Sequence, residues 1–246
     1  MPRRRAYAIP ELFLGLLAIS VAIVITANMV TDTVVERRRV DDKISVTGSA
    51  REPISANLVR WTLNVGKEDD TPARAARILR GDVKEVRSFL RNAGIPADAI
   101  TTSVVTSERI VLQLSKKRRL IRYRVTQELE VRTRDIDAVE PVATRVGELI
   151  ERGIGVSAGS LRYLSTELTQ AKLDALEAAT EEAHRRAEIL VKGLGGKLGR
   201  MRSSSLGVYQ VTPRDSTDVS DYGINDTTSR EKDVTAVVTA TFSVKR

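Results

Sequence analysis

The pattern of apolar and polar residues separates an uncharged N-terminal stretch from a long, highly charged remainder. Leu12 to Val30 contains no ionisable side chain, and its apolar residues fall on all faces of a helix. A helix needs about 20 mostly apolar residues to span a bilayer, and a surface helix would carry a polar stripe. The sequence therefore predicts a transmembrane helix over residues 12–31, between a basic cytoplasmic tail (1–11) and a charged linker (32–43).

Two alternatives to this anchor stay open. Arg3–Arg5 could begin a cleaved signal peptide with a poor cleavage site at Ile25–Ala27, although the apolar run is longer than usual for such a segment. A buried core helix is the third interpretation. Lys and Arg are nearly balanced around the span, and the short basic tail favours a cytoplasmic N-terminus. We expect a single-pass inner (cytoplasmic) membrane protein with its C-terminal domain periplasmic or extracytoplasmic.

Beyond the linker the apolar residues alternate, as in strands with one buried face. Ile44 and Val46 begin a short strand, and Arg51–Pro53 is expected to form a turn. Residues 58–66 form the next strand, and the clearest alternation lies in 120–134, after a strand over 99–114. Because one face of these strands is polar, the pattern indicates antiparallel sheet.

Helical periodicity appears three times. Thr71 and Pro72 suit a helix start, and that helix should end at Gly94. A second helix starts at Asp135 and ends before Gly153, and a long Ala- and Glu-rich helix covers about 167–192. Residues 156–165 and 197–209 are expected to be strands, 210–233 a flexible loop, and 234–244 the last strand. The order predicts the α+β class, with antiparallel sheets and helices packed on one face of them, in a domain over 44–246.

The composition of the chain excludes several kinds of catalytic and binding site. The net charge of +8 is spread over interleaved Lys, Arg, Asp and Glu, which is weak evidence for nucleic-acid binding. The chain has no cysteine, which excludes disulfides, thiol catalysis and cysteine zinc sites, and it has a single histidine. We predict no catalytic residue, no metal site and no cofactor.

Local motifs have structural explanations. The glycines at 193–199 do not fit a phosphate-binding motif and follow a helix, so we expect a helix stop. Asp135 and Asp137 suit a helix N-terminus. His184 is expected to be exposed or locally paired. The acids at 218, 221 and 226 do not have calcium-loop spacing and are expected in a solvated loop.

The sharpest basic cluster outside the linker is Lys116, Lys117, Arg118 and Arg119, at the tip of a predicted hairpin. Near a bilayer, each cation could gain about 1 kcal/mol from anionic headgroups. Alternatively, the charges protect the hairpin from edge pairing. Both interpretations stay open, and possible contact with lipid headgroups is the candidate site that the sequence offers.

Several segments together resemble the SIMPL-domain family of bacterial envelope proteins. They are ISVTGSA (44–50), LRNAGIPADAITTS (90–103), YRVTQELEVRTRDID (123–137), EAHRRAEILVKGLGGKLGRM (182–201) and the last strand. The resemblance implies a secreted or membrane-tethered, non-enzymatic protein that self-assembles, in a family with links to stress tolerance and antigenicity. It supplies no catalytic residues.

Three hypotheses follow. The first is a tethered domain that acts by homo-oligomerisation, or by binding an unknown envelope protein, with envelope stress tolerance as the expected setting. The second is an enzyme on an envelope substrate, which would need a nucleophile–base pair or a metal constellation. The third and weakest is nucleic-acid binding, which we do not expect.

Overall fold

The computed structural model describes residues 42–115 and 118–245, which form two compact units. The first unit contains described residues 42–48, 180–206 and 238–245, and the second contains 49–179 and 207–237. Within this part of the chain, no helix is both long enough and apolar enough to cross a bilayer. The predicted transmembrane helix over 12–31 and all but the last two residues of the predicted linker lie outside the described residues.

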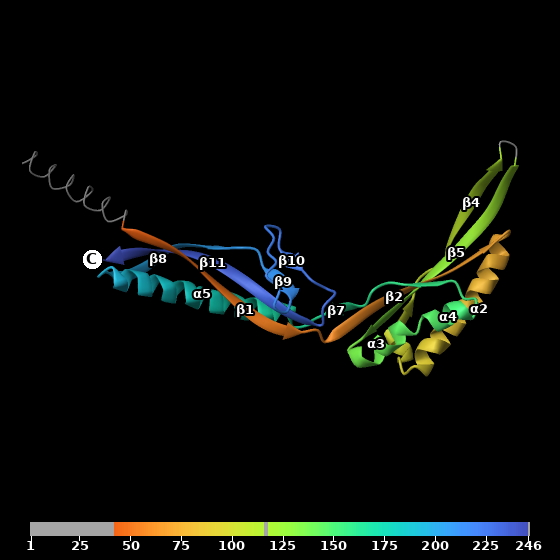
Figure 1. Cartoon of the computed structure of the whole chain (residues 1–246), viewed down its shortest axis with the longest axis horizontal. Coiled ribbons are helices and arrows are strands. Elements are labelled where there is room, and N and C mark those ends of the chain that lie inside the picture. Colours follow the sequence, from red (N-terminus) through yellow and green to blue (C-terminus); the bar gives the residue numbers. More distant parts are fainter. Residues whose placement is uncertain (1–41, 116–117, 246) are drawn as a thin grey trace, which may run out of the picture. The chain divides into compact units, whose positions relative to one another are not determined.

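The α+β class is confirmed, because the described strands form two mainly antiparallel sheets that helices accompany. In the first unit, β11 (Glu231–Lys245) lies between β1 (Lys43–Ser55) and β8 (Lys197–Leu206). Helix α5 (Leu168–Gly193) runs beside these strands (Figure 1). By residue range, β1, β11 and α5 all continue into the second unit.

Alanines bring α5 close to the sheet. The residues Ala171, Ala175, Ala179, Ala183, Ala187 and Val191 recur at every fourth position and are all buried. In the first unit, Ala183 and Ala187 pack against Val46, Ala240 and Phe242. Ala240 and Phe242 belong to a face of β11 on which every second residue from Val234 to Phe242 is buried, so the alternation expected of this strand is confirmed.

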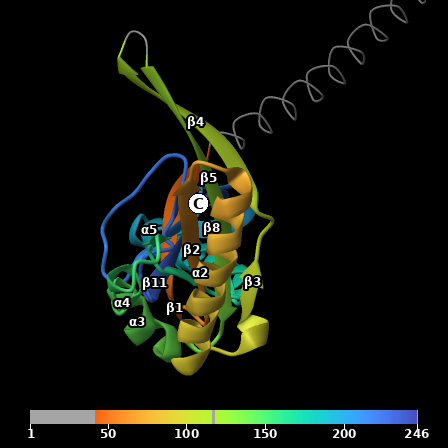
Figure 2. The same cartoon turned by 90° about the vertical axis from the view of Figure 1, so that its right-hand side faces the viewer.

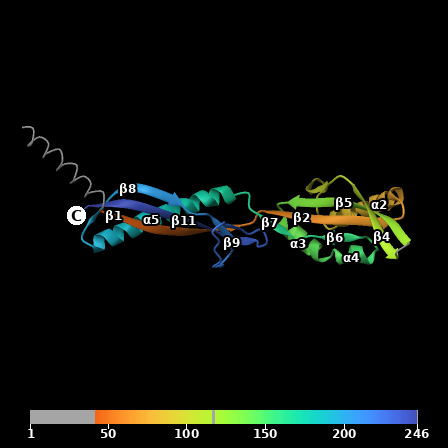
Figure 3. The same cartoon turned by 90° about the horizontal axis from the view of Figure 1, so that it is seen from above.

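The second unit is built on the antiparallel pair β2 (Leu58–Asp69) and β5 (Arg118–Thr133), and helix α2 (Pro72–Asn92) packs along both strands (Figure 2). β3 (Ile100–Thr102), which follows the 3-10 turn η1 (Ala97–Ala99), and β4 (Thr106–Ser115) pair with β5. β6 (Val156–Ala158) and β7 (Arg162–Leu164) pair with β2. The remaining elements are α3 (Ile136–Thr144), α4 (Gly147–Glu151), β9 (Gln210–Pro213) and β10 (Ile224–Asn225), with α3 and α4 visible near β6 in Figure 3.

The core of this unit is aliphatic around one tryptophan. Trp61, Leu63 and Val65 of β2 are at most 1% exposed, as the alternation predicts. The Nε1–H of Trp61 donates a hydrogen bond to the carbonyl of Gly159 at 3.0 Å. The buried face of α2 is also the predicted one. Thr71 has the extended backbone of an N-cap, but its side chain makes no capping bond.

Several predicted elements differ from the structure. The strand expected over 99–114 is two strands, β3 and β4, separated by residues 103–105. Arg51–Pro53 is not a turn, because β1 continues through it at a sheet edge, where a proline needs no ladder donor. The strand expected over 156–165 is two strands, β6 and β7, separated at Gly159. The segment 210–233 is not free of regular structure, since it contains β9, β10 and the start of β11.

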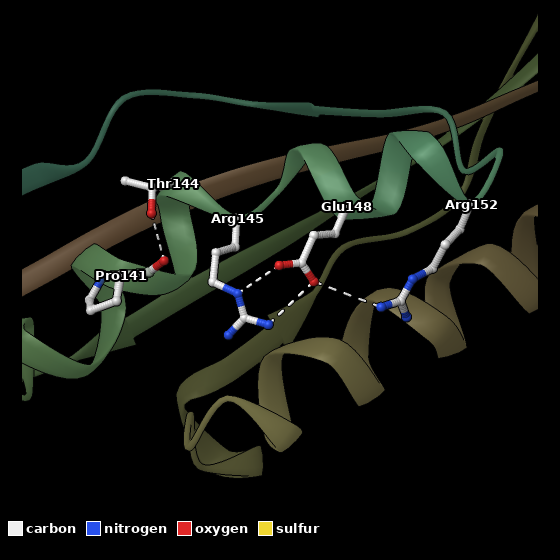
Figure 4. Close-up of polar contacts among 5 residues, drawn as sticks. All are labelled: Pro141, Thr144, Arg145, Glu148 and Arg152. Atoms are coloured by element: carbon white, nitrogen blue, oxygen red, sulfur yellow. Dashed lines mark hydrogen bonds and ion pairs between the residues drawn. The ribbon is translucent and has the colours of Figure 1, made fainter.

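The helix predicted from Asp135 is broken into α3 and α4 (Figure 4). The hydroxyl of Thr144 donates to the carbonyl of Pro141 at 2.8 Å, and the N–H of Arg145 donates to Val142, three residues back. Both bonds reach only three residues back and occupy carbonyls in the last turn of α3. This turn is therefore tightened, and the helix ends here. Asp135 caps α3 as expected, accepting from the N–H of Ala138 at 3.1 Å.

Candidate functional site

The strands β4 and β5 continue as a two-stranded ribbon beyond the rest of their sheet. Pairing between β2 and β5 ends at Asp69 opposite Tyr123, whereas β4 pairs with β5 as far as Ser115 opposite Arg118. Over 118–122, β4 is therefore the one strand neighbour of β5 among the described residues. We call residues 110–115 and 118–122 the arm, which extends beyond the end of α2 in Figure 2.

Apolar side chains are exposed on both faces of the arm. Val111 lies opposite Ile121 on one face, and Leu112 lies opposite Leu120 on the other. Their exposed fractions are 49%, 39%, 45% and 37%, respectively. Cross-strand apolar pairs stabilise a ribbon, but side chains on a two-stranded ribbon have no layer to bury them. The arm therefore presents apolar surface on two sides.

The Ile121 face continues the core face of the sheet. Val125, Leu129 and Val131 lie on the same side of β5 and are at most 1% exposed. The alternation over 120–134 places Ile121 on the same face and predicts that it is buried. That prediction is wrong, because the strand continues beyond the layer that covers Val125. A two-stranded ribbon is marginally stable in water without further packing. This geometry favours an additional partner against the arm.

The predicted basic cluster lies at the end of the arm. Arg118 and Arg119 begin β5 and are exposed, and the Nε–H of Arg119 donates to Oε1 of Gln113 at 3.0 Å. Lys116 and Lys117 lie outside the described residues. The hairpin connection itself is confirmed by the β4–β5 pairing. Headgroup contact and protection against edge pairing both stay predictions.

Ion pairs hold the base of the arm to β2. The Nε–H of Arg124 donates to Oε1 of Glu68 at 2.7 Å, and Arg122 lies 3.8 Å from Asp70. These side chains are partly exposed, so each pair contributes no more than about 1 kcal/mol. Their effect is to fix the direction in which the ribbon leaves the sheet.

A second charged group, at the α3–α4 break, has a structural explanation. Glu148 accepts from Arg145 at 2.7 and 3.3 Å and lies 3.8 Å from Arg152 (Figure 4). The hydrogen bond from Arg145 holds the pKa of Glu148 below its usual range. Arg145 also lies over the ring of Phe89, 5.7 Å from its centre. A carboxylate that two guanidinium groups neutralise is a poor general base. The contact of Arg145 with Phe89 joins the helix break to α2.

The other residues singled out from the sequence are also in local contacts. Asp137 pairs with Arg230 at 2.7 Å. His184 is half-exposed. Its ring and the ring of Phe242 are in a T-shaped arrangement with 5.7 Å between the ring centres, and its Nδ1 lies 3.8 Å from Oε1 of Glu188. No group of three or more His, Cys, Asp or Glu residues within 42–115 and 118–245 is arranged to hold a metal ion.

The sequence context suggested that Asp226 lies in a solvated loop, and that prediction is wrong, because its side chain is buried. Its carboxylate lies 2.8 Å from Nζ of Lys232, and the two side chains are only 8% and 3% exposed. Asp218 does lie on the surface, where it accepts from the hydroxyl of Ser216. Sequence reasoning missed the buried pair because one acid among many polar residues carries no signal of burial.

Comparison with known proteins gives one family. The SIMPL family, described as a protein of unknown function (DUF541), matches residues 44–242. No curated protein matches. Among solved structures, similarity is found to an amidase of the hydantoinase/carbamoylase family from Burkholderia phymatum, with 13% identity, a TM-score of 0.26 and coverage of 55% of this chain and 36% of that one.

A second similarity is to a putative amidohydrolase/peptidase from Burkholderia cenocepacia, with 16% identity, a TM-score of 0.20 and coverage of 54% of this chain. The matched part spans about a third of each of these solved chains, at 36% and 34% of their lengths.

Proposed function

This chain belongs to the SIMPL family, and from that premise we propose that it is a membrane-tethered, non-enzymatic module of the bacterial cell envelope that works by self-assembly through its arm. The apolar segment over residues 12–31 is the proposed tether to the inner membrane, and the described residues lie outside the cytoplasm. The observation that carries the proposal is the arm, with apolar pairs exposed on both faces of an unsupported ribbon.

The energetics favour a contact that depends on the tether. Burying what remains exposed of Val111, Leu112, Leu120 and Ile121 would contribute roughly 3–5 kcal/mol. That alone corresponds to association at about millimolar concentration, before the cost of ordering is subtracted. Tethered copies share one membrane plane, so their effective concentration is high and a weak contact suffices.

A free strand edge would also orient the partner in this contact. β4 pairs with β5 alone among the described strands, so its outer edge is available for main-chain hydrogen bonds to another strand. Charges near the tip oppose indiscriminate edge pairing. A second copy of the arm matches both properties, because its apolar faces are the same. An unknown envelope protein with an exposed strand is the alternative partner, and stress tolerance is the proposed physiological setting.

The test is the size of the full-length protein in detergent, measured by light scattering after gel filtration. Wild type should be oligomeric, and Leu112→Ser with Leu120→Ser should shift it to monomer at the same concentration. Val219→Ser with Tyr222→Ser is the matched control, since these side chains are 82% and 97% exposed outside the arm. A wild type that is strictly monomeric at high concentration refutes assembly, and an unshifted arm variant refutes the role of the arm.

The other parts of the proposal have their own measurements. Protease accessibility in spheroplasts tests the location of the described residues. Metal analysis and a screen with simple esters and phosphates test the enzyme hypothesis, and turnover that depends on one side chain would contradict the non-enzymatic role. Retention on DNA at physiological salt would support nucleic-acid binding, which we do not propose.

A further inference from the structure

Several elements of the first unit begin or end at the same place. Lys245 near the end of β11 lies opposite Lys197 at the start of β8. The N–H of Val244 donates to the carbonyl of Asp42, which directly precedes β1, at 2.8 Å. Helix α5 ends at Gly193, a short turn before β8. Figures 1 and 3 both show these ends together.

Positive charge gathers at this end. Lys43, Lys192, Lys197 and Lys245 are exposed, and none of them forms a salt bridge with any residue that the structure describes. Lys197 and Lys245 lie directly opposite each other in the β8–β11 ladder. Like charges in that position destabilise a sheet, so the arrangement favours an anionic partner. The acid at the same end is Asp42.

An exposed leucine lies among these lysines. Leu194 is 85% exposed in the turn after α5. The N–H of Gly195 donates to Lys192 at 3.0 Å, and the N–H of Gly196 donates to Val191 at 2.9 Å. These are the two bonds of a Schellman motif, with Gly195 at a φ of 78°. A hydrogen-bonded turn therefore holds the apolar side chain in solvent. We call Leu194 and the four lysines the lysine end.

We infer that the lysine end rests on an anionic lipid surface, with Leu194 at the level of the headgroups and the lysines against lipid phosphates. The inference rests on the proposed tether. Residues 32–41 connect the apolar segment to Asp42, and fully extended they reach at most about 35 Å. Since Asp42 is part of this end, the chain enters the first unit beside the lysines.

The chemistry selects lipid over another protein surface. An exposed apolar residue with several lysines at the same end of the unit suits an anionic interface, where the apolar side chain inserts and the cations stay with the headgroups. Each lysine strengthens such binding by a factor of about five. Removing Lys197 and Lys245 together should therefore weaken the contact about 25-fold.

The test uses the full-length protein in vesicles and a single labelled cysteine, because the natural chain has none. Leu194→Cys, labelled with an environment-sensitive dye, should be quenched by spin-labelled lipid in vesicles containing phosphatidylglycerol. Leu206→Cys is the matched control, since Leu206 is 49% exposed at the other end of the same strand as Lys197, about 30 Å away. It should not be quenched. Lys197→Gln with Lys245→Gln should abolish most of the Leu194→Cys quenching.

Each outcome is decisive. Flotation of the vesicles under carbonate first tests the tether, so a chain that is washed off refutes the proposed function on which the inference rests. A chain that stays bound but shows no quenching at position 194 refutes the inference alone. If the dye signal depends on the density of protein in the membrane and not on lipid charge, the surface binds a second copy, and this result also refutes the inference.

Discussion

The buried pair of Asp226 and Lys232 gives a sharp test of how the second unit is stabilised. Besides Lys232 Nζ at 2.8 Å, the carboxylate accepts from the N–H and hydroxyl of Thr228 at 2.9 and 2.7 Å and from the N–H of Ser229 at 3.1 Å. Burial raises the pKa of Asp226, but hydrogen bonds from Lys232 and Thr228 outweigh burial and hold that pKa well below its usual range.

The perturbation is Lys232→Met, which keeps the length of the side chain and removes its charge. Deleting one partner of a buried pair costs about 3–5 kcal/mol, because an uncompensated charge is left behind. Three donors still serve the carboxylate in this variant, so we expect the lower end, about 3 kcal/mol. For a unit of this size, Tm should fall by about 6–12 °C.

Trp61 supplies the assay. It is the single tryptophan of the chain, is 1% exposed, and belongs to the same unit as the ion pair. Its emission during thermal unfolding therefore reports the loss of this unit. Asp226→Asn with Lys232→Met is the compensating variant, since no charge remains and the amide oxygen, in the place of Oδ1, still accepts from the N–H and hydroxyl of Thr228. The hydrogen bond from the N–H of Ser229 goes to Oδ2 and is lost, but the variant should be clearly less destabilised than Lys232→Met because no uncompensated charge is buried.

The dependence on pH has a definite sign. A folded-state pKa below the unfolded value contributes stability above the ordinary carboxyl pKa, near pH 4, and loses it as pH falls toward the folded pKa. Lys232→Met removes the cation that lowers this pKa, so the deficit relative to wild type should be full near pH 7 and should shrink as pH falls below about 4. A deficit independent of pH, or a compensating variant as unstable as Lys232→Met, would refute the reasoning.

The remaining predictions concern two glycines and one tyrosine. Gly81 is exposed within α2 and a Cβ there would meet nothing within 4 Å, so Gly81→Ala should stabilise the protein by about 0.5–1 kcal/mol in urea unfolding followed by Trp61. A Cβ at Gly155 would lie 2.6 Å from the carbonyl oxygen of Gly66, so Gly155→Ala should cost about 1–3 kcal/mol; equal stability in both variants would contradict the packing. Burial and the hydrogen bond to Glu140 raise the pKa of Tyr163 to about 12, so its contribution to stability is present below about pH 10 and is lost as pH rises toward the folded value. Ultraviolet titration should show a late phenol that Tyr163→Phe removes, and five phenols titrating together would contradict it.

The regular elements could be predicted where one physical signal dominates. Alternation identified the buried faces of β2 and β11, because each strand has one face against a helix and one toward solvent. The start of α2 at Pro72 and the end of α5 at the 193–196 glycines follow from local backbone chemistry. These features depend on neighbours along the chain, so the sequence displays them directly.

Features that depend on distant neighbours could not be predicted in the same way. Arg51–Pro53 has the composition of a turn, yet β1 runs through it because β11 lies alongside. Lys232 lies six residues from Asp226, which is too far for the two side chains to be neighbours within one strand or helix, and the loop between them brings them together. Periodicity likewise placed Ile121 on the core face of β5, but it carries no information on how far along β5 the covering helix α2 reaches.

The two proposed contact surfaces share a physical property. The arm leaves apolar pairs without a covering layer, and the lysine end sets Lys197 opposite Lys245, so each arrangement works against the stability of the isolated fold. Asp135, which caps its helix, and Asp226, which accepts from Lys232, Thr228 and Ser229, follow local rules instead. Where a locally consistent sequence breaks such rules, a functional site is the expected reason. The surfaces also differ in chemistry, since one is apolar with a free strand edge and the other is cationic around one leucine. That difference assigns a protein strand to the arm and a lipid surface to the lysine end, so substitutions in one should leave the contact made by the other intact.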